Sequence, residues 1–209
     1  ERAYLLTGTQ HGPAQFPART TTGQQPANPV NYWWAMRALL VAMDRWVRQG
    51  VAPPASQIPR IADGTLVPAE RVAFPAIPGV PSPRTIGPGR QGGKPLPLLV
   101  PQVDDDGNER AGIRLPDVVV PLATYTGWNF RNESIGGTKE LVSLMGSAVP
   151  FSKRRTAHEG AQDPRRSIEE RYPSRDGYLV RVREAADGLT SKGYLLADDA
   201  PQIVKRAEE

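Results

Sequence analysis

The sequence from Asn28 to Gln49 predicts a long helix that is apolar around most of its circumference. Asn28 is a good N-cap, Pro29 suits the first helical position, and Gly50 can end the helix. Steps of three and four residues place one set of apolar side chains on a single face: Trp33, Met36, Leu40, Met43 and Val47. Such a helix needs a large apolar surface to pack against, and the rest of the chain offers few candidates. We therefore infer that the sheet it packs on is largely missing from these residues.

Composition predicts one ordered domain with much irregular backbone. The 209 residues suffice for a real core, but 22 prolines and 20 glycines favour loops. The absence of cysteine excludes disulfides and thiolate metal sites.

Charge and hydropathy exclude two classes of partner. The net charge is +4, but positive and negative residues are interleaved, and no element that would dock on nucleic acid is recognisable. The densest basic runs, Lys153–Arg155 and Arg165–Arg166, are predicted to be solvated loop. No apolar run reaches the ~18 residues that span a membrane. We expect neither a nucleic-acid nor a membrane partner.

The chain divides into three predicted parts. Residues 1–52 hold a buried strand over 2–10, a polar loop and the long helix. Residues 53–160 form an irregular lobe rich in proline and glycine, with short strands over 65–67 and 72–74. In this lobe a hairpin is predicted, with arms over 98–103 and 111–114 around an Asp/Gly/Asn turn. Residues 161–209 are helical, with helix starts predicted at Asp163, Ser174 and Asp198 or Asp199.

His11 is the candidate catalytic residue. The chain has two histidines, and His158 is assigned to a polar surface loop. His11 follows the predicted strand directly, and Gly8 and Gly12 leave room around it. A histidine at the carboxyl edge of a sheet can take a proton from a serine hydroxyl and later return it to a leaving group. Its ordinary pKa suits both steps.

No nucleophile and no metal site is predicted within these residues. Gly-x-Ser-x-Gly does not occur, and the nearest sequence, around Ser134, has Asn132 in place of the first glycine. The acidic cluster from Asp104 to Glu109 fits a turn better than a calcium loop, because Ile113 stands where the last calcium ligand belongs. No glycine-rich phosphate loop opens a helix, so no cofactor is expected.

The segment 124–131 is dense in aromatic and amide side chains. Two interpretations stay open. It anchors the irregular lobe, or it forms a wall over a substrate pocket. In the second case the candidate substrate-binding residues are Tyr125, Trp128 and Asn129.

Three stretches, residues 6–12, 31–40 and 121–129, resemble a bacterial family of alpha/beta hydrolase domain-containing proteins. The resemblance extends to residues 113–117 and 193–196, yet covers only the C-terminal part of the family's usual length. It implies an α/β fold in which residues 1–52 are the last core strand and the long helix of an α/β-hydrolase. It also implies that His11 is the triad histidine, with the serine and the acid upstream.

Two functional hypotheses follow. The first is the C-terminal segment of a serine hydrolase that acts on a small acyl or ester substrate, inactive without the upstream part of the same protein. The second is a non-catalytic binding or interaction module derived from a hydrolase.

Overall fold

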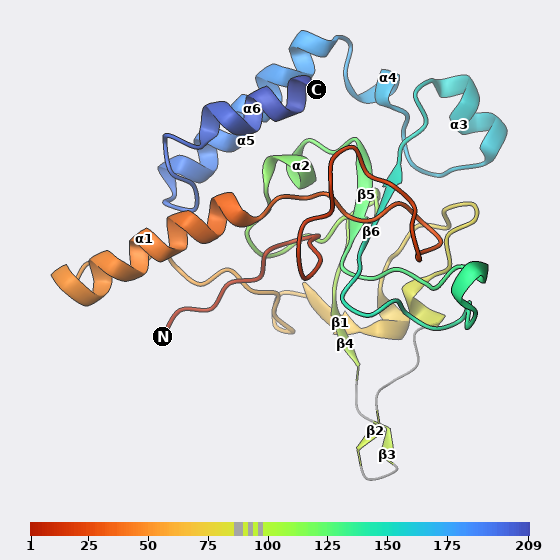
Figure 1. Cartoon of the computed structure of the whole chain (residues 1–209), viewed down its shortest axis with the longest axis horizontal. Helices are drawn as coiled ribbons and strands as arrows, with labels where there is room; N and C mark the ends of the chain where they lie inside the picture. Colours follow the sequence, from red (N-terminus) through yellow and green to blue (C-terminus); the bar gives the residue numbers. More distant parts are fainter. Residues whose placement is uncertain (86–89, 92–93, 96–97) are drawn as a thin grey trace.

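The computed structural model describes residues 1–85, 90–91, 94–95 and 98–209, which form a mixed helix-and-strand fold (Figure 1). The helices are α1 (Trp33–Gln49), α2 (Pro116–Val119), α3 (Arg155–Ala161), α4 (Ile168–Arg171), α5 (Arg175–Ser191) and α6 (Ala200–Glu208). Short 3₁₀ turns are η1 (Ala69–Arg71), η2 (Pro83–Thr85) and η3 (Glu133–Ile135). The strands are β1 (Leu66–Pro68), β2 (Arg90–Gln91), β3 (Lys94–Pro95), β4 (Leu99–Pro101), β5 (Ala123–Thr126) and β6 (Ser147–Pro150).

The strands of the described residues pair antiparallel in three two-stranded sheets, β1 with β4, β2 with β3, and β5 with β6. The large parallel sheet of an α/β-hydrolase core is not among the described residues. The predicted strand over 2–10 is wrong in its extent and its burial. The segment makes single parallel bridges, Tyr4 to Gln57 and Leu6 to Ile113, and its apolar side chains are only half-buried. Pro54 and Pro59 lie on either side of Gln57, and proline has no N–H group to donate to a ladder.

The hairpin prediction is correct for its turn and for the pairing next to the turn, where Val103 forms an antiparallel bridge with Glu109, and it is wrong for the rest of its arms. Asp104 Oδ1 accepts hydrogen bonds from the N–H groups of Asp106 and Asn108, so the acidic cluster does form a turn. However, β4 pairs with β1, and the other arm leaves the turn so that Ile113 N donates to Leu5 O at 2.8 Å. The strand predicted over 65–67 is confirmed as β1, one residue further on. Residues 72–74 follow η1 and form no strand.

Helix α1 starts four residues later than predicted and exposes its apolar stripe. Asn28 does not cap it, because its Oδ1 accepts from Val30 N in the preceding loop. The end is as predicted, with Gly50 in the left-handed conformation. Small residues on the opposite face are buried, whereas the predicted stripe is open: Trp33 is 53% exposed, Leu40 62% and Val47 80%. Figure 1 shows α1 reaching out from the body of the molecule.

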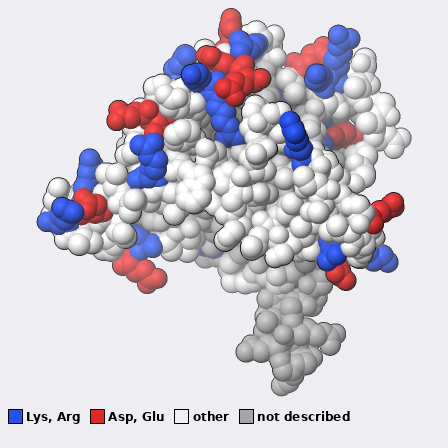
Figure 2. Space-filling model, in the orientation of Figure 1, with Lys and Arg blue, Asp and Glu red and all other residues white. Residues whose placement is uncertain are grey.

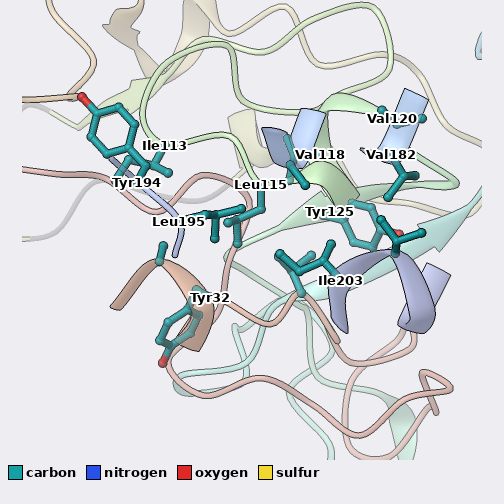
Figure 3. Packing of buried hydrophobic residues seen from close by; sticks show 14 of the residues in the cluster. Tyr32, Ile113, Leu115, Val118, Val120, Tyr125, Val182, Tyr194, Leu195 and Ile203 are labelled. Atoms are coloured by element: carbon teal, nitrogen blue, oxygen red, sulfur yellow. The ribbon is translucent and has the colours of Figure 1, made fainter. Parts of the chain in front are cut away.

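Two hydrophobic clusters hold the fold together. The larger joins residues from all three predicted parts of the chain, such as Tyr32, Ile113 and Val182 (Figure 3). The smaller lies within the irregular lobe and consists of Val72, Phe74, Ile77, Val103 and Val149. Helices α5 and α6 pack against each other, and both contribute side chains to the larger cluster.

Two of the three helix starts predicted in the C-terminal part are correct. Ser174 caps α5 and Asp199 precedes α6, as predicted. The start predicted at Asp163 is wrong, because α4 begins after Ser167, whose hydroxyl forms a capping box with Glu170. His158 lies in α3 rather than in a loop. On the face drawn in Figure 2, acidic and basic side chains are interspersed along the helices, and much of the centre is uncharged.

Candidate functional site

His11 lies in an anchored loop with its side chain exposed. Its carbonyl accepts a hydrogen bond from the Tyr32 hydroxyl. Next to it, Gln10 Oε1 accepts from Asn28 N at 3.2 Å and from Gly146 N at 2.8 Å. Within the described part of the chain, the imidazole itself has no hydrogen bond or ion pair. The backbone is therefore fixed, while the ring remains available to groups from elsewhere.

The turn before His11 is tied to strand β5. Gly8 has a φ of +61°, and a Cβ there would lie 3.3 Å from the carbonyl oxygen of Tyr125. Asn28 Nδ2 donates to the carbonyls of Gly8 and Thr126 at 2.7 and 2.9 Å. Gly8 N donates to Glu109 Oε2 at 2.9 Å. These contacts set the position from which the histidine loop (residues 11–27) starts.

A mostly apolar cavity of about 110 Å³ lies beside this turn, at the end of β5. Tyr125 and Trp128 line it, together with Phe74 and Glu109. The Trp128 ring packs against Phe74 and Phe130 with centroid distances of 5.5 and 5.7 Å. Burial raises the pKa of Glu109 above its ordinary value, and the hydrogen bond from Gly8 offsets this in part. The cavity thus offers aromatic surfaces and one carboxyl group.

The structure brings two of the predicted substrate-binding residues, Tyr125 and Trp128, to this cavity. Asn129 is buried beside it and is not among the lining residues. Its Nδ2 donates to the carbonyls of Gln25 and Gly146, and its Oδ1 accepts from Gln25 N. The Asn129 side chain therefore holds loops in place. His11 is not in the lining either.

Glu109 is a lining residue that the sequence analysis treated only as part of a turn. The neighbouring sequence does not distinguish Glu109 from the other acidic side chains between positions 104 and 109. Its role depends on contact with Gly8, which lies 101 positions away in the sequence.

Ser134, the nearest match to a nucleophile motif, and Ser147 are both hydrogen-bonded to other side chains. Ser134 is exposed, and its Oγ donates to Asn132 Oδ1 at 2.6 Å. Ser147 is buried, with its Oγ 2.7 Å from Thr126 Oγ1. The residues that the structure describes contain no cluster of three His, Asp or Glu side chains able to hold a metal ion. Over the same residues, every helix is too short or too polar to cross a bilayer.

Comparison with known proteins identifies the family. A family model described as "Alpha/beta hydrolase domain" matches residues 2–205, which is almost the whole chain. Neither the curated proteins nor the solved structures gave a match. The match over nearly all residues shows that this chain belongs to the alpha/beta hydrolase domain family.

Proposed function

We propose that this chain is the C-terminal part of a serine hydrolase that cleaves carboxylic esters, and that His11 is its general base. The observation that carries the proposal is the family match, combined with a histidine whose ring is left free on an anchored loop. In α/β-hydrolases the triad histidine follows the nucleophile and the acid in chain order. The sequence has no Gly-x-Ser-x-Gly, so the nucleophile would come from residues before Glu1.

The exposed stripe of α1 supports the same proposal. Apolar side chains in this number are seldom left in water over one continuous helix face. Trp33, Leu40 and Val47 would pack on the parallel sheet and neighbouring helices supplied by the upstream part. This arrangement also explains why the described residues include only two-stranded sheets.

The chemistry would proceed in two steps. The serine Oγ attacks the ester carbonyl carbon while His11 takes the hydroxyl proton. The C–O bond to the alcohol then breaks, and the alcohol leaves with that proton. Water attacks the acyl-enzyme with the same histidine as base, which releases the acid and restores the serine. Tyr125 and Trp128, which line the cavity at the end of β5, would contact the apolar part of the substrate.

Labelling with a fluorophosphonate probe tests the proposal on the protein that includes the upstream residues. His11→Ala is expected to slow labelling of the serine by about 10²-fold or more, because a general base contributes that much. His158→Ala is the matched control, since it removes the other histidine of the chain, in α3. Equal labelling rates for the two variants would show that His11 is not the base. No labelling of the unmodified protein would favour a non-catalytic module instead.

A further inference from the structure

A second cavity, of about 220 Å³, lies where α5 and α6 meet α2 and β5. It is separate from the site beside Gly8, although Tyr125 contributes to both linings. Its apolar walls include Val182 and Ile203, which belong to the larger hydrophobic cluster (Figure 3). Phe16, from the histidine loop, lies at its border and is about half exposed. A partly exposed aromatic side chain therefore borders the cavity.

The wall of this cavity contains an ion pair between Asp117 and Arg206 that makes no hydrogen bond. Arg206 Nη1 is 3.9 Å from Asp117 Oδ1, which is within ion-pair range but beyond hydrogen-bond distance. The other terminal nitrogen of Arg206 donates to the carbonyl of Pro29. Asp117 is 27% exposed, and burial raises the pKa of its carboxyl group. A carboxylate oxygen in the cavity is thus left able to accept a hydrogen bond from a ligand.

Three further polar side chains line the same cavity. Tyr125 and Tyr178 line the cavity together with Asp117, and burial and, further, the charge of Asp117 raise the pKa of both tyrosines, so both hydroxyls stay protonated. The indole N–H of Trp34 is buried without a hydrogen-bond partner in the described part of the chain. An unpaired buried donor carries a free-energy penalty that a ligand acceptor nearby can relieve.

We propose that this cavity binds a small uncharged alcohol with an apolar body. The charged side chains of the lining are Arg206, Asp117 and Glu209, so a ligand cation would meet the arginine and a ligand anion would meet two carboxylates. A hydroxyl group avoids both conflicts, because it donates to Asp117 and accepts from a tyrosine hydroxyl. The apolar body then packs on Val182 and Ile203. The proposal does not depend on ester hydrolysis or on His11.

Titration with benzyl alcohol, followed by the indole N–H resonances of the four tryptophans, tests the proposal. The Trp34 resonance, assigned with Trp34→Phe, is expected to shift in a saturable way, while that of Trp46 on the exposed part of α1 stays unchanged. Toluene, benzoate and benzylamine are the matched probes, because they lack the hydroxyl or carry a charge. We expect each to bind about tenfold more weakly than benzyl alcohol.

Two variants locate the site. Asp117→Asn is expected to weaken binding of benzyl alcohol about tenfold, and Tyr178→Phe to weaken it without removing a buried charge. Asp44→Asn is the matched control, since it breaks an Asp–Arg pair on the exposed surface of α1. If Asp117→Asn does not fold by circular dichroism, Tyr178→Phe decides the question. Equal affinity for toluene, tighter binding of benzylamine or benzoate, or equal effects of Asp117→Asn and Asp44→Asn would overturn the proposal.

Discussion

Asp163 and Arg165 form a bidentate ion pair that is almost completely buried. Arg165 Nε donates to Asp163 Oδ1 at 2.9 Å, and Nη2 donates to Oδ2 at 2.7 Å. The two side chains are 9% and 2% exposed. Arg165 Nη1 also donates to Thr124 Oγ1 and to the carbonyl of Val149, so the guanidinium joins both strands of the β5–β6 sheet to the segment before α4.

Arg165→Met is expected to lower the free energy of unfolding by about 3–5 kcal/mol, because it leaves the carboxylate of Asp163 buried without its cation. Urea denaturation followed by circular dichroism measures the change. Arg155→Met is the control, since Arg155 pairs with Glu159 on the exposed surface of α3. Equal losses for the two variants would contradict a structural role for the buried pair.

Gly146→Ala is expected to destabilise the fold by about 1–3 kcal/mol, because an added methyl group overpacks a site that cannot expand. A Cβ at Gly146 would lie 2.1 Å from the carbonyl oxygen of Thr126. Gly12→Ala is the matched control, since nothing lies within 4 Å of a Cβ there. Thermal denaturation of both variants checks the prediction, and a melting temperature of Gly146→Ala no lower than that of Gly12→Ala would refute it.

Local sequence patterns correctly predicted those helix ends that depend only on neighbouring residues. The predicted start of α5 at Ser174 and the predicted end of α1 at Gly50 are correct, because a cap depends on a few neighbouring residues. Asn28 has the same cap chemistry, but its side chain bonds Gly8 and Thr126, which are distant in sequence. Arg165 belongs to a basic run predicted to be solvated, but it is buried, because Asp163 and the strands β5 and β6 supply its hydrogen-bond partners.

In the candidate site, too, local sequence signals were readable, whereas contacts between residues distant in sequence were not. The segment 124–131 was recognisable from its aromatic and amide content, and it does contribute Tyr125 and Trp128 to a cavity. Glu109 was not recognisable as a lining residue, because only the fold brings it to Gly8. The periodicity of α1 correctly grouped Leu40 and Val47 on one face, but periodicity does not say whether a partner for that face lies within the chain.

Glu109→Gln is expected to flatten the dependence of stability on pH. Burial raises the pKa of Glu109 in the folded state, so the folded protein holds this proton more tightly than the unfolded chain does. The group therefore contributes its full stability below its unfolded pKa and loses it as pH rises through the raised value. Glutamine keeps an acceptor for Gly8 N and never ionises.

Urea denaturation of both proteins from acidic to neutral pH measures this effect. We expect Glu109→Gln to gain stability relative to the unmodified chain as pH rises above the ordinary range of glutamate. Glu133→Gln, an exposed residue of η3, is the control and should leave the pH profile unchanged. A difference that grows instead as pH falls would contradict the raised pKa.

The double substitution Leu40→Gln and Val47→Gln is expected to have opposite consequences in two forms of the protein. In the chain of residues 1–209, both side chains are exposed, so stability should change little and binding of a hydrophobic dye should fall. In a protein that includes the upstream residues, the same change should lower the free energy of unfolding by about 3–6 kcal/mol, because two buried aliphatic side chains are lost. Ala38→Gln, on the buried face of α1, should destabilise both forms. Equal, small effects of the double substitution in both forms would show that the upstream part does not cover this face.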